Sequence, residues 1–319
     1  MKLIRKKSRG YSLVELMIAA ALGLLLVSLV VAAVTNAIAI SSRIGQAGEL
    51  FENAQYLTRL LKYELSMAGF YGGVDYPVNT SIEKPHICNK ISDGNIANTL
   101  SYPIDGINAV ASGGRLCGKD LLLPGSDVLL VRRSLLAEYS PRSRLKSKQH
   151  YIQTSTDNFV LSLGSKPADF YLTNEDNSEF LPVRIWQQTI YYLSADNNFK
   201  RRRFLKGKYT RAEPLVEGVI DFQLLYGIAP SSREGGDPSV EAEFVEFPTS
   251  KRQWQQLVAI RFYLLLSSTE QSSGDGNPKL LNYLGKEKQV FDNRQYDLFS
   301  GMARLKNISP VIMEFDIEI

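Results

Sequence analysis

The sequence contains few of the residues that usually carry chemistry. Its 319 residues include only two Cys and two His, too few for a zinc finger or for a small fold built on many disulfides. His86 and His150 lie far apart, and the common signatures of serine hydrolases, P-loop proteins, zinc proteases and dithiol oxidoreductases are absent. We therefore expect no enzyme activity, no cofactor, and no catalytic or metal-binding residue.

The composition excludes other classes of protein. Apolar residues make up 44% of the chain and charged residues 22%, which is ordinary for a globular protein and argues against disordered, collagen-like and multi-span membrane chains. The net charge of +4 would fit a partner such as nucleic acid, so the location of the positive charge matters.

The positive charge is concentrated at the N-terminus. Residues 1–10 contain five basic residues and no acid, so the other 309 residues carry a net charge of −1. From Leu16 to Ser42 there are 27 consecutive positions without a charge, and about 20 apolar residues suffice to cross a bilayer as a helix. The basic segment would then stay in the cytoplasm while the rest of the chain is exported.

Glu15 is an unusual residue at the start of an apolar segment. A carboxylate carried to the bilayer centre costs about 2–3 kcal/mol and normally faces a partner. If the chain is cut after Gly10, Tyr11 becomes the first residue and its α-amine could pair with Glu15 of a neighbouring subunit. Burial would strengthen that attraction because the local dielectric constant is low.

At these residues the chain resembles type IV pilins and pseudopilins. Their signature is a short basic leader followed by Gly, an aromatic residue, Ser or Thr, Leu, an aliphatic residue and Glu, and residues 10–15 match it with Tyr in place of the usual Phe. The resemblance implies that a prepilin peptidase cleaves between Gly10 and Tyr11 and N-methylates Tyr11. It also implies that Glu15 supports subunit docking in a helical fibre.

Two other interpretations of the N-terminus remain open. A secretory signal would explain the small residues Ala37-Ile38-Ala39, although its apolar region is normally only 7–15 residues long. A plain single-span anchor would retain Met1. Mass spectrometry of the mature N-terminus distinguishes the three.

The apolar segment continues into an amphipathic pattern. Apolar residues recur every three or four positions, at Ala47, Leu50, Ala54, Leu57, Leu61, Leu65 and Ala68, as on one face of a helix. Polar residues, Glu64 among them, would occupy the other faces, and Gly69 supplies a stop signal. We expect a leader at 1–10 and a long helix at 11–69, with 11–42 in the membrane or fibre core and 43–69 as a stalk.

Further motifs resemble PilW-type minor pilins in particular. They are Glu52-Asn53, Met67-Ala68-Gly69-Phe70-Tyr71-Gly72, Tyr191-Tyr192-Leu193 with Arg201-Arg202-Arg203, Pro214–Gln223, Trp254 with Val258–Phe262, and Phe299–Asn307. Each is weak alone, and their order along the chain gives them value. The family often has Cys where this chain has Gly73.

The remaining residues, 70–319, are expected to form an exported α+β pilin domain in which the long helix packs on antiparallel sheet. Strands are predicted at 127–131, 151–154, 159–163, 185–193, 199–205, 215–226, 257–266, 304–308 and 311–319. The segment 71–126 is expected to be irregular, and 228–252 and 267–297 to be surface loops.

Cys88 and Cys117 both lie in the irregular segment. An exported domain is in an oxidising space, so we predict a disulfide that adds roughly 3 kcal/mol. Two free thiols or a metal pair involving His86 are the alternatives.

One basic cluster stands out in the domain. Seven of the residues 200–211 are basic, including Arg201, Arg202, Arg203 and Lys206, and Arg142, Arg144, Lys146 and Lys148 alternate as on one face of a strand. Such groups can contact phosphates, bind an acidic patch on another pilin, or simply discourage aggregation at a solvated sheet edge.

The sequence thus predicts a minor pilin that primes or caps a type IV pilus and supports twitching motility. It would be a single-pass protein of the bacterial inner membrane with a periplasmic C-terminal domain, and later part of the fibre or its tip. The expected partners are the prepilin peptidase, other minor and major pilins, and the inner-membrane assembly platform. A type II secretion pseudopilin, or a DNA-uptake or adhesion subunit, is the alternative.

Overall fold

The computed structural model describes residues 10–72, 84–88, 97–139, 144–156, 158–205, 208–229, 242–269, 279–290 and 294–308. The predictions made for the leader 1–9, for Arg142, for Lys206 and for a strand at 311–319 lie outside these residues. The described residues divide into two units. One contains the N-terminal helix as far as Glu49 and the hairpin 279–290; the other contains Leu50–Thr269 and the residues from Tyr296 onward.

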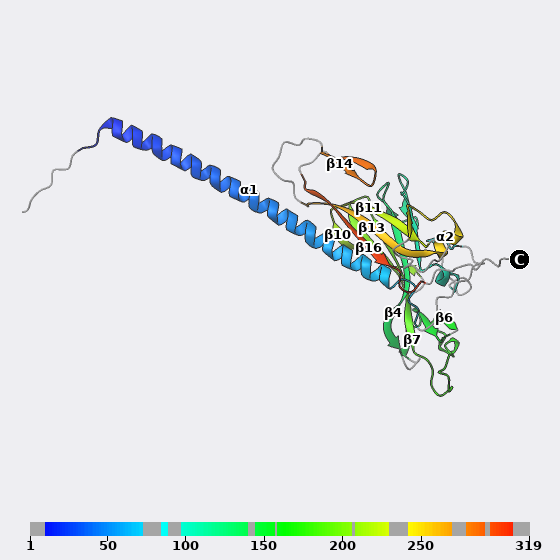
Figure 1. Cartoon of the computed structure of the whole chain (residues 1–319). Coiled ribbons are helices and arrows are strands. Elements are labelled where there is room, and N and C mark those ends of the chain that lie inside the picture. Colours follow the sequence, from blue (N-terminus) through cyan, green and yellow to red (C-terminus); the bar gives the residue numbers. More distant parts are fainter. Residues whose placement is uncertain are drawn as a thin grey trace, which may run out of the picture. The chain divides into compact units, whose positions relative to one another are not determined.

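The N-terminal helix is a single element, α1, which spans Leu13–Ser66 and 54 residues (Figure 1). It lies within the 11–69 range predicted for it. In the second unit its apolar stripe is buried at Leu50, Ala54, Leu57, Leu61 and Leu65. Ala47 is exposed, so the buried stripe begins one turn later than the sequence pattern indicated.

Residues distant in sequence close the C-terminal end of α1. The last carbonyls of a helix lack partners within it, and here the side-chain amide of Asn307 donates to Ser66 O at 2.9 Å and to Ala68 O at 3.4 Å. Gly69 has a φ of +75°, and a Cβ there would lie 2.9 Å from Asn307 O. The predicted stop at Gly69 therefore has two physical causes, a left-handed backbone and a close backbone approach.

The other regular elements of the described chain are strands and short helices. In chain order after α1 they are η1 Ala97–Ser101, β1 Ile104–Ile107, β2 Arg115–Leu116, β3 Asp120–Leu121, β4 Val128–Tyr139, β5 His150–Thr154, β6 Phe159–Leu163, η3 Pro167–Asp169, β7 Val183–Leu193, β8 Asn198–Leu205, β9 Lys208–Tyr209, β10 Glu213–Glu217, β11 Val219–Ile228, β12 Glu243–Val245, α2 Lys251–Gln255, β13 Leu257–Ser267, β14 Lys279–Tyr283, β15 Lys286–Val290 and β16 Tyr296–Arg304.

The larger sheet has eight strands, with the order β1-β4-β7-β5-β6 and a branch of β8, β9 and β10. All its pairings are antiparallel. The branch exists because β7 is long: its N-terminal part pairs with β5 and its C-terminal part with β8. The two hairpins predicted from the sequence, β5–β6 and β7–β8, are confirmed.

The smaller sheet has four strands in the order β12-β11-β13-β16. The sequence predicted one strand from Leu215 to Tyr226, but the structure divides it into β10 and β11 at Gly218, whose φ is +75°. The break sends β10 to the larger sheet and β11 to the smaller one.

One apolar core joins α1 to both sheets. It combines the helix stripe with buried side chains of β4 and β7 from the larger sheet and of β11 and β13 from the smaller one. At about 1.5–3 kcal/mol for each fully buried large aliphatic side chain, the leucines of the stripe contribute substantially to this packing. The fold is α+β, with a long N-terminal helix and antiparallel sheet.

Some predictions of local structure were wrong. The segment 267–297 is not only loop, because β14 and β15 pair within it, and 228–252 contains β12. Residues 304–308 are not a separate strand, since β16 ends at Arg304. The alternating basic residues after Arg142 do not lie on a strand: described residues 144–149 are a single 3₁₀ residue, irregular backbone, a turn at 147–148 and a bend.

Candidate functional site

The residues expected to direct assembly lie at the beginning of α1. Gly10 is exposed, and Tyr11 retains 88% of its accessible surface. The Glu15 carboxylate accepts a hydrogen bond from Ser12 N at 3.0 Å, and the Ser12 hydroxyl accepts one from Val14 N at 3.3 Å. Ser12 and Glu15 therefore act as a reciprocal cap for the first turn.

This cap gives Glu15 a local role within one chain. A carboxylate near a helix N-terminus is favoured by the helix dipole. The charged Glu15 side chain therefore costs less free energy at this position than it would in the middle of the helix. The same cap points the carboxylate toward the backbone just after Tyr11. Gly10 and Tyr11 are both exposed, so the bond at which cleavage is predicted is accessible.

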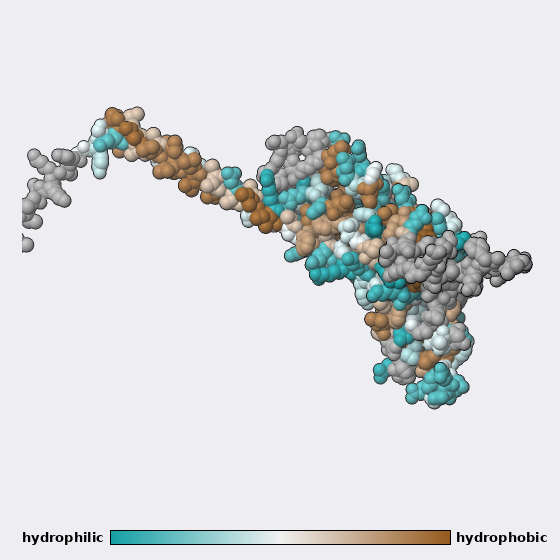
Figure 2. Space-filling view, viewed as in Figure 1, coloured by the Kyte–Doolittle hydropathy of each residue, from teal (hydrophilic) through white to brown (hydrophobic). Residues whose placement is uncertain are grey.

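The rest of the N-terminal half of α1 is uncovered and apolar. Its exposed large side chains include Leu13, Val14, Leu16, Met17, Ile18, Leu22, Leu24, Leu25, Leu26, Val27, Leu29, Val30, Val31, Val34, Ile38, Ile40 and Ile44. Figure 2 shows this brown surface along the helix. Among the described residues, α1 is the one helix long and apolar enough to cross a membrane. Such an extensive apolar surface needs lipid or other helices around it.

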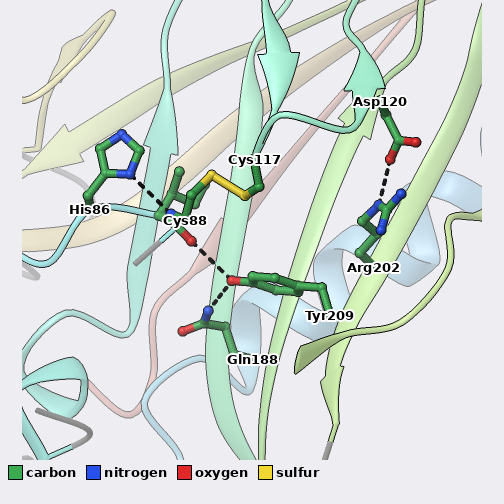
Figure 3. Close-up of a disulfide and its surroundings, with 8 residues drawn as sticks. His86, Cys88, Cys117, Asp120, Gln188, Arg202 and Tyr209 are labelled. Carbon is green, nitrogen blue, oxygen red and sulfur yellow. Dashed lines mark hydrogen bonds and ion pairs between the residues drawn. A yellow bond between two sulfur atoms is a disulfide. The ribbon is translucent and has the colours of Figure 1, made fainter. Parts of the chain in front are cut away.

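Cys88 and Cys117 are joined by a disulfide with a Cα–Cα distance of 5.2 Å (Figure 3). It ties the short segment before Cys88 to the turn between β2 and β3. His86, the ligand considered for a metal, instead accepts a hydrogen bond on Nδ1 from Cys88 N at 3.2 Å. No group of His, Cys, Asp and Glu suited to a metal ion occurs among the described residues.

Hydrogen bonds position the same segment from the other side. The Tyr209 hydroxyl donates to Ile87 O at 3.1 Å and accepts a hydrogen bond from the Gln188 side chain (Figure 3). Burial raises the pKa of Tyr209 to about 12, so the hydroxyl keeps its proton for this bond.

The basic cluster on β8 is paired with acids of the same domain. Arg201 makes two hydrogen bonds to the Glu213 carboxylate, at 2.7 and 2.9 Å, and Arg203 makes a third at 2.9 Å. The hydrogen bond from Arg201, aided by that from Arg203, lowers the pKa of Glu213 to about 2. Lys200 pairs with Asp196 at 2.8 Å.

Arg202 points elsewhere, toward Asp120 at 2.5 Å and Thr210 O at 2.8 Å. Burial opposes ionisation of Asp120, but hydrogen bonds from Arg202 and Tyr192 hold its pKa below the usual value. The sequence pattern did not reveal Asp120, Asp196 and Glu213 as partners. Glu213 could have been anticipated, because it lies across a turn from the arginines, whereas Asp120 is 82 residues from Arg202.

The predicted site residues thus form three separate groups rather than one centre: the N-terminal cap, the disulfide and the paired arginines. Of the basic cluster, Lys208 and Arg211 are exposed. The three paired arginines leave less uncompensated charge for phosphates than the sequence suggested.

The sequence pattern did not predict one further ion pair, because the apolar repeat indicated that Glu64 lies on the polar face of the helix. Glu64 and Arg133 are both buried, with side chains about 7% exposed, and they form a two-pronged contact at 2.8 and 3.0 Å. The arginine also lies over the Tyr63 ring, 5.3 Å from its centre. This pair joins α1 to β4.

Comparison with known proteins gives two family matches. The prokaryotic N-terminal methylation motif matches residues 5–33, and the family described as type IV pilus-assembly protein W matches residues 190–307. No curated protein sequence matches the chain. Among solved structures, a type IV-like pilin from Thermus thermophilus matches with a TM-score of 0.36 and 13% identity, covering 82% of this chain and 96% of the other.

The methylation motif followed by the uncovered apolar helix is typical of type IV pilins. Together with the family match over residues 190–307, it supports a type IV pilin of the PilW type. Pilins of this family are typically structural rather than enzymatic. The resemblance to this family implies interaction with other pilins and with the prepilin peptidase, and the methylation motif with its apolar helix indicates membrane anchoring and association with a pilus.

Proposed function

We propose that the chain is a minor pilin that primes or caps a type IV pilus and has no catalytic activity. In this proposal the prepilin peptidase cleaves between Gly10 and Tyr11 and methylates Tyr11. Before assembly, the mature chain is anchored in the inner membrane with its C-terminal domain in the periplasm. It then joins other minor and major pilins at the assembly platform and enters the fibre or its tip.

The observation that carries the proposal is the uncovered apolar surface of α1 behind an exposed cleavage site. The large apolar side chains from Leu13 to Ile44 are exposed, and none of them belongs to the core that joins α1 to the sheets, so this surface can pack with equivalent helices. Exchange of lipid for neighbouring helices keeps the apolar surface covered at every stage.

A low-copy position suits the size of the domain. The described part of the chain after α1 includes a sheet of eight strands and a sheet of four, and such a bulky domain would crowd a tight helical lattice. At the tip of a fibre, no further subunits lie on one side of the domain, so the domain is less crowded there.

Deletion of the gene tests the proposal. We expect loss of surface pili and of twitching, restored by the wild-type chain from a plasmid, while secretion of exoproteins continues. Intact piliation with lost secretion would instead identify a type II secretion pseudopilin. Co-purification of the tagged wild-type chain with other prepilin-like proteins is the matching biochemical readout.

A further inference from the structure

An open groove lies at the end of the larger sheet, beside the turn between β5 and β6 and the segment that leads into β7 (β6 and β7 are labelled in Figure 1). Its volume is about 790 Å³, and it is broadly open to solvent. The lining residues are Ser155, Thr156, Asn158, Tyr171, Leu172, Thr173, Asn174, Glu175 and Asn177.

The wall of the groove is fixed from below by a buried side chain. The Gln153 amide donates to Leu172 O at 3.0 Å and to Leu181 O at 2.7 Å, and its oxygen accepts from Leu172 N at 3.0 Å. These bonds anchor the two ends of the segment that carries Tyr171 to Asn177 onto β5. A site held in this way spends little free energy on ordering when a ligand binds.

Hydrogen bonds within the segment stabilise its shape further. The Asn174 oxygen accepts from Ser178 N at 2.9 Å, and the Thr173 hydroxyl donates to the Asn177 oxygen at 2.6 Å. The Asn158 oxygen likewise accepts from Phe159 N at 2.8 Å. In both Asn158 and Asn177 the oxygen is used by the protein, so the NH₂ group is the end left to face a ligand.

The lining combines hydrogen-bonding groups with apolar surface, including one aromatic ring. Tyr171 is 59% exposed, and Thr156, Asn158, Glu175 and Asn177 are exposed beside it. Amide donors, hydroxyls and a carboxylate that can accept suit a ligand rich in hydroxyl groups, and the ring offers a flat face to the apolar side of a sugar.

The charge of the groove restricts the ligand further. None of its lining residues is Lys or Arg, and Glu175 is followed in the same segment by Asp176 and Glu179. An anionic ligand would meet like charge there without a compensating cation. Among the lining residues the large hydrophobic side chains are Leu172, which is buried, and Tyr171, which is exposed.

We propose that this groove binds a neutral oligosaccharide, with the sugar stacked on Tyr171 and hydrogen-bonded to the amides of Asn158 and Asn177 and to Glu175. The role would be recognition of a surface glycan, and binding in the groove does not depend on the assembly function proposed above.

The full-length chain in lipid nanodiscs, free of sugar-based detergents, is titrated with cellohexaose, chitohexaose and lacto-N-tetraose by calorimetry and saturation-transfer NMR. We expect at least one of them to bind with a Kd of about 1 mM or tighter. Tyr171→Ala should weaken that binding about tenfold, the loss expected for one aromatic contact. Tyr171→Phe keeps the ring and should change the Kd by less than about threefold.

Phe180→Ala is the matched control, because Phe180 is an aromatic residue of the same segment, 51% exposed, that does not line the groove. It should leave the affinity unchanged, and all variants should melt within a few degrees of wild type. The proposal is overturned if none of the three sugars binds at about 10 mM, or if Tyr171→Ala binds as well as wild type. Tighter binding of sialyllactose than of lactose would also overturn it, since the groove lacks a cation for the sialic acid carboxylate.

Discussion

Glu213 shows how a single residue changes the meaning of the basic cluster. Three hydrogen bonds from Arg201 and Arg203 reach its carboxylate, so this part of β8 and β10 is a local ion-pair network. The network fixes the pairing of two strands at the end of the branch, and it reduces the attraction of this surface for nucleic acid.

We predict that Glu213 makes stability depend on pH below neutrality. Its pKa falls from 4.5 when unfolded to about 2 when folded, so its stabilising effect is complete above pH 4.5 and is lost as the pH falls through 2. Glu213 is 43% exposed, so solvent screens the pair and the effect should be roughly 0.2–1 kcal/mol. Thermal unfolding from pH 6 to pH 2 should show a shallower slope for Glu213→Gln than for wild type.

Glu217→Gln is the control for this prediction. Glu217 is an exposed acid at the other end of β10 and makes no ion pair within the described part of the chain. Its replacement should leave the slope as in wild type. Equal slopes for wild type and Glu213→Gln would show that the network does not couple to folding.

At the scale of elements, the sequence reveals local patterns better than distant pairings. The apolar repeat of α1 and the turn residues between β7 and β8 act over a few positions, so the helix and both hairpins could be predicted. Glu64 was assigned to the polar face because a helical pattern cannot show that Arg133, 69 residues away, pairs with it. The Asn307 cap on α1 was unpredictable for the same reason.

The candidate functional residues show the same difference between local patterns and distant pairings. Gly10, Tyr11 and Glu15 form a contiguous motif, and their local geometry is the capped start of a helix. The partners of Arg201, Arg202 and Arg203 depend on how β8 pairs and on where the β2–β3 turn lies, which no short pattern encodes. The groove beside Tyr171 is likewise built from two segments that only the sheet brings together.

We predict that the Glu64–Arg133 pair is essential to the contact between α1 and β4. Glu64→Ala would leave the Arg133 guanidinium buried without a carboxylate and should lower the free energy of unfolding by about 3–5 kcal/mol. The double variant Glu64→Ala/Arg133→Met removes both charges and should be more stable than Glu64→Ala alone. Urea denaturation of the full-length chain in nanodiscs, followed by near-UV circular dichroism, measures both.

Glu52→Ala is the matched control, since Glu52 is an exposed acid on the same helix, and it should change stability by less than about 0.5 kcal/mol. If Glu64→Ala were as mild as Glu52→Ala, the buried pair would contribute nothing beyond packing.

At the scale of the whole molecule, the two halves of α1 have different surroundings. From Leu50 onward one apolar stripe of the helix is buried in the protein core, whereas the large apolar side chains before it are exposed. The core therefore does not depend on what surrounds the N-terminal half. Under the proposed function, such a chain would pass from membrane to fibre while its domain kept the same packing.

Glu15 is where assembly and helix structure can be separated. In the single chain its carboxylate caps the first turn through Ser12 N, and Gln can make the same hydrogen bond at that position. Glu15→Gln should therefore keep the helix and leave the helical circular dichroism and the membrane anchoring unchanged. It removes the charge that would attract the α-amine of a neighbouring subunit in a low-dielectric environment.

We predict that the variant is cleaved after Gly10 but enters sheared pili at least about tenfold less than wild type, a loss of about 1.4 kcal/mol or more. Immunoblots of membrane and sheared-pilus fractions measure this ratio, and Glu52→Gln serves as the control with an exposed acid far from the first turn. Normal incorporation of Glu15→Gln would show that capping, and not charge, is what the fibre requires of this residue.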